Sequence, residues 1–355
     1  MSMPNTPIRL DSSELYSPKV EAYLEEQAVL RRAVPEEDRR PLLIRILYAN
    51  YFYLSLAGMA GALAAWAMLE PFFGEEEAAH KRVGLVGFLL FPTVAGMIGL
   101  FLGSVEGLIC RNPLRALICA VVGLGVGFGG GLLALIPAGL IFAIMVQITV
   151  HFWKNPQPNQ MPTGLPLLIL IMGRAAAWAV AAIPAGLGQG IALRERKVLL
   201  NGLLGSALGG LVGGLLFDPI ALVLQSHETA AVSRAVGFAV IGIMVGLFVG
   251  LVEQWTKTAW LLMKTGPLAG KQFILHRTPS VLGSSPKADV YLFKDAAIEP
   301  RHALIHNRGG RFEIEDCETA DGTYVNGIPV QRRVLQTGDQ IVLGKTLLEF
   351  VLREQ

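Results

Sequence analysis

Long apolar stretches separated by short polar turns fill the chain up to about residue 256, and short alternating runs replace them afterwards. A helix that crosses a bilayer needs about 20 predominantly apolar residues. Six stretches reach that length, at about residues 44–69, 83–109, 114–136, 174–193, 198–223 and 235–255. The pattern predicts an α-helical transmembrane bundle of about six spans within residues 44–256.

One segment of this bundle is too long for a single upright span. Apolar character continues from Leu114 to Phe152, and a further apolar run covers Leu165–Gly173. Proline lacks a backbone N–H and breaks or kinks a helix, so we expect an interruption at Pro137. The pieces beyond it would form an extra hairpin or lie at the membrane interface, and the sequence leaves both alternatives open.

Small residues recur at every fourth position of three predicted helices, which indicates an internal repeat of helical hairpins. This spacing gives a helix a flat face on which the backbone of a neighbour can approach closely. The glycines expected at helix contacts are Gly99, Gly103, Gly186, Gly190, Gly242, Gly246 and Gly250.

Basic residues gather in the short turns on one side of the predicted bundle. Arg111 and Arg115 occupy one such turn, and residues 194–197 (RERK) occupy another. Lys and Arg accumulate in cytoplasmic loops of membrane proteins. Six spans then place both termini in the cytoplasm, with residues 1–43 as a cytosolic tail. We therefore expect a multi-pass protein of the inner (plasma) membrane.

Few ionisable groups interrupt the apolar stretches. Glu106, Asp218 and Glu253 lie near span ends, with Arg111 beside Glu106. We expect interfacial pairing for these carboxylates and an interhelical hydrogen bond for Gln189. Transport paths usually carry ionisable groups at mid-membrane, so packing explains this bundle better than transport does.

The spacing of hydrophobic and polar residues changes in the last hundred residues. Short β-rich runs are separated by turn signals such as Gly309-Gly310, Asp321-Gly322 and Asn326-Gly327. Nine or more short strands with this spacing are typical of an all-β sandwich. We place this second domain at residues 258–355.

The motifs of this domain resemble those of the forkhead-associated (FHA) family. They are Gly283, Arg301-His302, Gly322-Thr323, Val325-Asn326-Gly327 and Gly338-Asp339. The resemblance implies a β-sandwich whose loops usually bind phosphothreonine peptides. It also implies that His302 braces the loops.

The chain departs from the family pattern where phosphate is held. Ser284 replaces an arginine, Glu299 replaces a serine and Asp321 replaces an asparagine. A phosphate group needs hydrogen-bond donors and is repelled by carboxylates, so we expect a domain that binds its partner without phosphate. The candidate loop residues are Gly283, Ser284, Glu299, Arg301, His302, Thr319, Asp321 and Gly322.

Composition and charge exclude several other functions. Charged residues make up 16% of the chain, against about 25% in soluble domains, and the net charge of +2 comes without a dense Lys/Arg run. A nucleic-acid partner is therefore not expected. The three cysteines form no CxxC or Cys/His cluster, and no catalytic, metal-binding or cofactor-binding motif is present. We expect a protein that is not an enzyme and uses no cofactor.

Taken together, these features predict an integral membrane protein that presents a cytosolic FHA-like domain to a cytosolic protein partner, for signalling or scaffolding. The bilayer is its second partner, and formation of a homo-oligomer stays open. One alternative is an FHA-regulated transporter or channel. The others are a phosphothreonine-peptide receptor and an inner-membrane component of a secretion apparatus.

Overall fold

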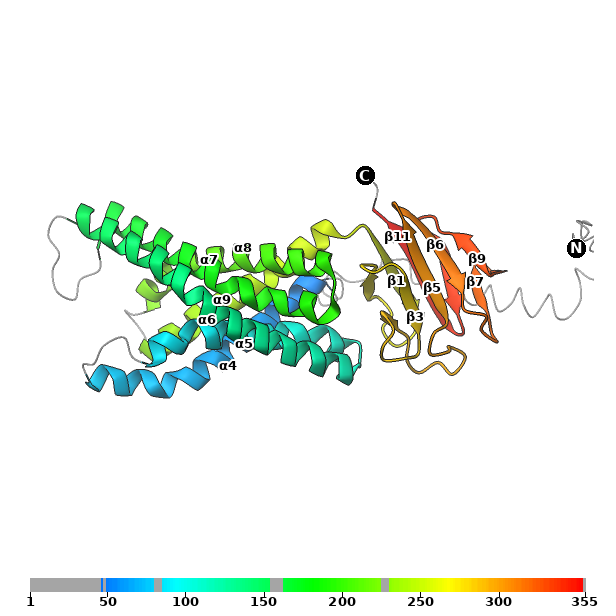
Figure 1. Ribbon diagram of the computed structural model, residues 1–355, viewed down its shortest axis with the longest axis horizontal. Coiled ribbons are helices and arrows are strands. Elements are labelled where there is room, and N and C mark those ends of the chain that lie inside the picture. Colours follow the sequence, from blue (N-terminus) through cyan, green and yellow to red (C-terminus); the bar gives the residue numbers. More distant parts are fainter. Residues whose placement is uncertain (1–45, 47–48, 80–84, 154–161, 225–229, 354–355) are drawn as a thin grey trace, which may run out of the picture.

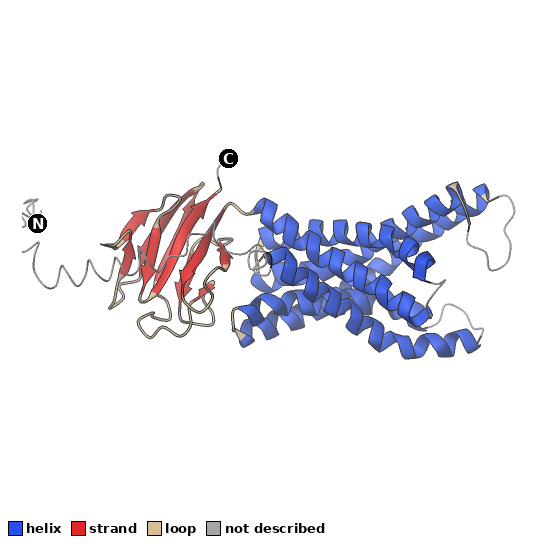
Figure 2. Ribbon diagram, turned by 180° about the vertical axis from the view of Figure 1, so that it is seen from behind, coloured by secondary structure: helices blue, strands red, loops and turns tan. Residues whose placement is uncertain are grey.

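The computed structural model describes residues 46, 49–79, 85–153, 162–224 and 230–353. The chain forms a bundle of six helices and a β-sandwich that lies at one end of the bundle (Figures 1 and 2). Helix α9 ends at Thr256 and strand β1 begins at Ala259, so a very short linker joins the two parts. The predicted tail of residues 1–43 lies outside the described residues.

Six helices make up the bundle, and all are long and apolar enough to cross a membrane. They are α4 (Asn50–Ala79), α5 (Leu85–Ile109), α6 (Pro113–Phe152), α7 (Leu165–Leu193), α8 (Arg196–Leu224) and α9 (Ala230–Thr256). Each helix packs against the next one along the chain, α9 packs against α4, and α5 also contacts α7. The prediction of about six long apolar helices is confirmed.

The expected interruption at Pro137 is wrong, because α6 runs unbroken through this residue for 40 residues. The apolar run Leu165–Gly173 belongs to the first turns of α7, so it forms neither an extra hairpin nor a separate interfacial segment. A proline removes one backbone hydrogen bond, and helices inside a bundle tolerate that loss when neighbouring helices support them. Helices α5 and α7 both pack against α6 and supply this support.

The predicted packing glycines lie at close contacts between helices. A Cβ atom added to any of the seven predicted packing glycines would lie closer than 3.0 Å to a neighbouring helix. Gly246 would meet the carbonyl of Leu54 on α4, and Gly186 would meet the carbonyl of Gly202 on α8. Backbone-to-backbone contact of this kind excludes any larger side chain, because a larger residue would fit only if one of the helices moved.

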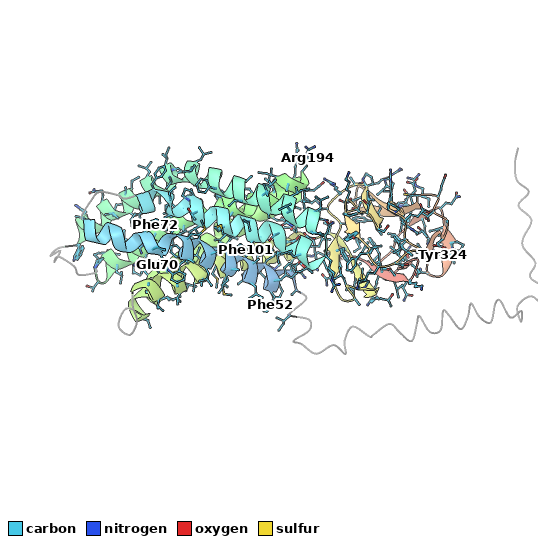
Figure 3. All side chains as sticks on the ribbon, turned by 90° about the horizontal axis from the view of Figure 1, so that it is seen from below. Phe52, Glu70, Phe72, Phe101, Arg194 and Tyr324 are labelled. Carbon is cyan, nitrogen blue, oxygen red and sulfur yellow. The ribbon has the colours of Figure 1, made fainter. Side chains whose placement is uncertain are left out.

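Ion pairs join helices at the end of the bundle that is far from the sandwich. Arg174 Nη1 lies 2.5 Å from Asp218 Oδ1 and links α7 to α8. Arg234 Nη2 lies 2.5 Å from Glu70 Oε1 and links α9 to α4. Figure 3 shows Glu70 toward the far end, whereas Arg194 lies at the end that faces the sandwich.

The C-terminal part is the predicted β-sandwich. One sheet has the strand order β2-β1-β11-β10-β7-β8 and the other has the order β4-β3-β5-β6-β9. The strands are β1 (Ala259–Thr265), β2 (Gln272–Ile274), β3 (Ser280–Gly283), β4 (Val290–Tyr291), β5 (Ala303–Arg308), β6 (Arg311–Asp316), β7 (Thr323–Val325), β8 (Ile328–Val330), β9 (Arg332–Val334), β10 (Gln340–Leu343) and β11 (Thr346–Leu352).

Alternating strand residues fill the space between the two sheets. Leu261, Leu343 and Phe350 from the first sheet and Ile305 and Ile314 from the second are almost completely buried. The aromatic rings of Phe312 and Phe350 lie 5.4 Å apart across the core. Burial of apolar side chains of this size stabilises a fold by about 1.5–3 kcal/mol each, so this core holds the loops at the ends of the strands in place.

Candidate functional site

Three loops of the sandwich meet at one edge and bring the predicted site residues together. They follow β3, precede β5 and join β6 to β7. The backbone N–H of Ser284 donates to the carbonyl of Glu299 at 2.9 Å, which ties the first loop to the second. Gly283 must be a glycine because a Cβ atom there would collide with the carbonyl of Pro300.

His302 is fully buried between these loops. Its Nδ1 accepts a hydrogen bond from the backbone N–H of Glu299 at 3.2 Å. Its Nε2 faces the carbonyl of Gly322 at 3.2 Å and the hydroxyl of Thr319 at 3.3 Å. A neutral imidazole has one acceptor and one donor, so Nε2 carries the proton and His302 links the second loop to the third.

Asp316, at the end of β6, organises the β6–β7 loop from the inside. Its carboxylate accepts hydrogen bonds from the hydroxyl of Thr323 at 2.6 Å and from the backbone N–H and hydroxyl of Thr319, both at 3.0 Å. Burial acts to raise the pKa of Asp316, but these hydrogen bonds outweigh it and hold the pKa below its ordinary value. These hydrogen bonds therefore favour the ionised form of the carboxylate.

Glu299 faces the third loop, although its own backbone belongs to the second. Oε1 of its carboxylate accepts a hydrogen bond from the backbone N–H of Ala320 at 3.0 Å. Both residues are exposed at the surface. A backbone donor that would otherwise face an incoming acidic group is thus engaged by a carboxylate of the protein itself.

The remaining predicted residues line the same face. Arg301 and Asp321 are exposed, and Ser284 is half-buried. Burial raises the pKa of the nearby Cys317 thiol, and Arg301 opposes that shift. Arg301 is a cation and Glu299 and Asp321 are anions, so the face that these loops form has a mixed charge.

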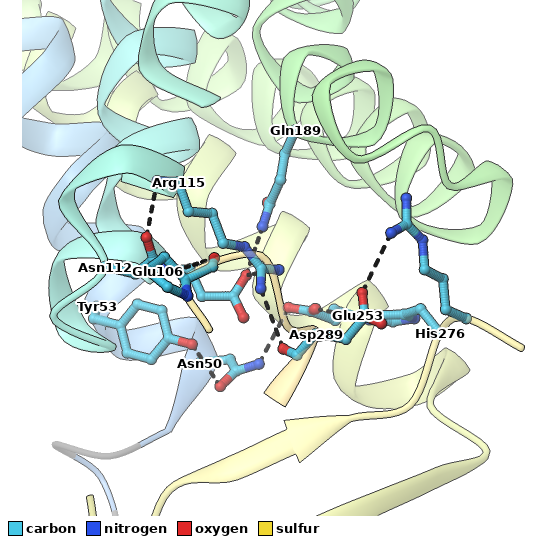
Figure 4. A network of polar contacts seen from close by, with 11 residues as sticks. Asn50, Tyr53, Glu106, Asn112, Arg115, Gln189, Glu253, His276 and Asp289 are labelled. Atoms are coloured by element: carbon cyan, nitrogen blue, oxygen red, sulfur yellow. Dashed lines mark hydrogen bonds and ion pairs between the residues drawn. The ribbon is translucent and has the colours of Figure 1, made fainter. Parts of the chain in front are cut away.

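A second polar cluster lies where the bundle meets the sandwich (Figure 4). Gln189 on α7 donates to the Glu106 carboxylate on α5 at 2.8 Å, which is the interhelical hydrogen bond expected for Gln189. The cationic neighbour of Glu106 is Arg115, at 4.0 Å, and not Arg111 as the sequence suggested. The turn between α5 and α6 brings Arg115 back over Glu106, whereas Arg111 lies 6.0 Å from the ring of Phe293.

The sandwich closes over this cluster. His276 Nε2 lies 3.5 Å from the Glu253 carboxylate, which also accepts from Asn50 at 3.2 Å. A cavity of about 50 Å³ remains between the helices and strand β2. We call the contacts among Asn50, Glu106, Asn112, Arg115, Gln189, Glu253, His276 and Asp289 the junction.

The junction holds the same loop that begins with Gly283 and Ser284. Asn112 caps α6 by accepting from the backbone N–H of Arg115, and its amide donates to the carbonyl of Pro286 at 2.6 Å. The Arg115 guanidinium donates to the carbonyl of Asp289 at 3.2 Å. The bundle therefore fixes the base of one of the three loops at the candidate site.

Sequence reasoning missed Asp316, Asn112, Arg115 and Asp289 as contributors to this site. Asn112-Pro113 is a recognisable helix start, because Asn is a favoured N-cap and Pro is favoured at the first helical position. Nothing local in the sequence connects that cap to a loop more than 170 residues later. Among the described residues, no group of His, Cys, Asp and Glu is arranged to hold a metal ion.

Comparisons with known proteins agree with this geometry. The family model for the FHA domain matches residues 280–344, which include β3 and run through β10. The C-terminal domain of this chain therefore belongs to the FHA family.

Two curated relatives are regulators by name. The chain is 40% identical over 94 residues to the oxoglutarate dehydrogenase inhibitor of Corynebacterium efficiens, a match that covers 26% of this chain and 66% of that protein. It is 38% identical over 94 residues to the glycogen accumulation regulator GarA of Mycolicibacterium smegmatis, with 26% and 59% covered. The chain thus spans slightly less than two thirds of the length of these relatives.

Solved FHA domains are also similar to part of the chain. The FHA domain of the CT664 protein from Chlamydia trachomatis matches at 26% identity with a TM-score of 0.26. The match covers 28% of this chain and all of that one.

Proposed function

We propose that this protein presents its FHA domain at a membrane surface and binds a protein partner through the three loops, without a requirement for phosphate. The hydrogen bond from Ala320 to Glu299 carries the proposal, because it occupies a loop donor with an internal anion. An incoming phosphate would have to displace a carboxylate that repels it. Ser284 supplies no positive charge in its place.

The junction supports the idea of presentation at a membrane. A domain on a free linker would sample many orientations, whereas Asn112 and Arg115 hold the loop after β3 against the helix ends. The three-loop face then keeps a constant orientation relative to the bundle. Such a domain would act in signalling or scaffolding.

The proposal includes an orientation of the protein in the membrane. The bundle lies in the inner membrane, and both termini lie in the cytoplasm. The basic turn at residues 194–197 and the pair Arg111 and Arg115 lie at the end of the bundle that faces the sandwich. Positively charged loops favour the cytoplasmic side of a membrane. A reporter enzyme that works only outside the cytoplasm, fused after Gln355, should stay inactive. A strongly active reporter would reverse the orientation.

Site-directed photocrosslinking tests the binding face in the full-length protein. A photoreactive residue at Arg301, on the three-loop face, should capture a defined protein partner in membranes. The same residue at Arg311, the first residue of β6, serves as the control because it pairs with Arg308 at the other end of β5. Phosphatase treatment before irradiation should leave the capture at Arg301 unchanged.

Two results would contradict the proposal. Loss of the crosslink after phosphatase treatment would make the protein a phosphothreonine-peptide receptor. Equal capture at Arg301 and Arg311 would show that the three-loop face is not a specific binding surface.

A further inference from the structure

A hollow of about 240 Å³ opens between the helices in the half of the bundle that is far from the sandwich. Aromatic rings from five helices line it: Phe91, Phe142, Trp178, Phe217 and Phe238. Trp178 meets Phe91 edge-on at 5.0 Å and Phe238 at 6.2 Å. Protein interiors are close-packed with few voids larger than a water molecule, so an apolar hollow of this size suits an apolar guest.

Of the described residues that line the hollow, Arg174 alone is charged. Its guanidinium lies 5.7 Å from the ring centres of both Phe142 and Phe217. Nη1 bonds to Asp218, which is almost fully buried. A guanidinium has five N–H donors in a fixed fork, and within the described part of the chain Nε and Nη2 have no hydrogen-bond partner. These donors remain for an anionic group.

Helix geometry places Arg174 at the level of lipid headgroups. Arg174 precedes Leu193, the last residue of α7, by 19 residues, which corresponds to about 28 Å along a helix that rises 1.5 Å per residue. The hydrocarbon core of a bilayer is about 30 Å thick. With the sandwich-facing helix ends at one membrane surface, Arg174 therefore lies near the opposite surface and Trp178 lies one helical turn deeper. The apolar first turns of α7, Leu165–Gly173, extend beyond Arg174.

The wall of the hollow also has room that no side chain fills. A Cβ atom added to Gly139 on α6 would meet nothing within 4 Å, although Gly139 lines the hollow beside Phe142. This is unlike the glycines at the helix contacts, where a Cβ atom would collide with backbone. Gly139 thus leaves space for a guest.

We infer that this hollow binds an anionic phospholipid, with its phosphate on Arg174 and one acyl chain against the aromatic rings. Arginine binds phosphate through paired N–H groups, and the apolar wall matches a hydrocarbon chain. The inference is independent of the proposed function of the FHA domain and concerns the opposite end of the molecule.

Photolabelling of the full-length protein in nanodiscs tests this site. The probe is a phosphatidylglycerol that carries a diazirine on one acyl chain, and peptide mass spectrometry locates its crosslinks. We expect crosslinks around Phe142, Trp178 and Phe238. Excess dioleoylphosphatidylglycerol should compete for them, whereas dioleoylglycerol, which has no phosphate, should compete about tenfold less well because it lacks the charge-assisted bonds.

Variants separate this site from general lipid contact. Gly139→Leu should remove the crosslinks by filling the hollow, whereas Gly129→Leu, on the same helix and also in open space, should keep them. The paired variant Arg174→Gln with Asp218→Asn removes both charges without leaving one buried alone, and it should weaken competition by phosphatidylglycerol about tenfold. Crosslinks that persist in Gly139→Leu, or equal competition by both lipids, would overturn the inference.

Discussion

The Glu299 carboxylate accepts a hydrogen bond from the backbone N–H of Ala320, a residue 21 positions later in the sequence. This contact joins two of the three loops at the edge of the sandwich. It gives the site an internal anion that occupies a backbone donor of the third loop. Four predictions test the loops, the bundle and the contacts between them.

Restoring phosphate donors should create a preference for phosphorylated peptides. In the triple variant Ser284→Arg, Glu299→Ser and Asp321→Asn, the Ala320 N–H becomes free and a guanidinium is added. Charge-assisted hydrogen bonds contribute about 1.5–3 kcal/mol, so we expect at least a tenfold preference for phosphothreonine peptides over unphosphorylated ones. Fluorescence anisotropy with a degenerate peptide library measures it, using the full chain in detergent.

Glu318→Ser provides a matched control for this experiment. Glu318 is an exposed carboxylate in the same loop, and its removal should create no preference. If the original protein already prefers phosphothreonine peptides at micromolar concentration, the internal anion does not exclude phosphate.

Protonation of Asp316 should make the sandwich less stable in acid. Its pKa is lowered in the folded protein, so its contribution is complete above the ordinary aspartate pKa of about 3.9. The contribution is lost as the pH falls through the lower folded-state pKa. At pH 7, Asp316→Ala should cost about 1–3 kcal/mol, because buried Thr323 loses its acceptor.

Denaturant unfolding of the full chain at pH 7 and in acid checks this prediction. The difference in unfolding free energy between Asp316→Ala and the original protein should shrink once the carboxylate is protonated. A difference that stays constant across the titration would mean that the charge of Asp316 does not stabilise the loop.

Gly246→Leu should disrupt the bundle. A Cβ atom at Gly246 would collide with the carbonyl of Leu54, and overpacking of this kind costs about 1–3 kcal/mol or more. Gly125→Leu is the control, since a Cβ atom at Gly125 meets nothing within 4 Å. Thermal unfolding in detergent should show a lower midpoint only for Gly246→Leu, and equal midpoints would argue against glycine-mediated packing.

Removal of the junction contacts should loosen the loop after β3. The double variant Asn112→Ala with Arg115→Ala loses the bonds to Pro286 and Asp289. Each bond contributes about 1 kcal/mol, so amide hydrogen exchange over residues 284–289 should become about tenfold faster or more. Lys197→Ala, which changes an exposed residue at the same end of the bundle, should leave exchange unchanged. Unaltered exchange in the double variant would show that the bundle does not hold this loop.

Much of the fold could be predicted from the sequence because its signals are local. Apolar stretches of sufficient length identified the six helices, and alternation with turn residues identified most strands of the sandwich. The expectation of nine or more short strands agrees with the eleven strands, β1 to β11, in the described residues. The chain motifs around His302 and Asn326 also sufficed to identify the FHA family, since loop glycines and bracing side chains occupy fixed positions in that domain.

Tertiary structure decided the features that depend on residues far apart in the chain. Pro137 does not interrupt α6, because packing against α5 and α7 outweighs the loss of one hydrogen bond. The partners of Glu106 and Glu299 come from other segments, which no local pattern specifies. The sequence alone determined the classes of secondary structure and the family of the C-terminal domain. The bond between Ala320 and Glu299, the junction and the hollow beside Arg174 exist only because folding brings together residues that are distant in the sequence.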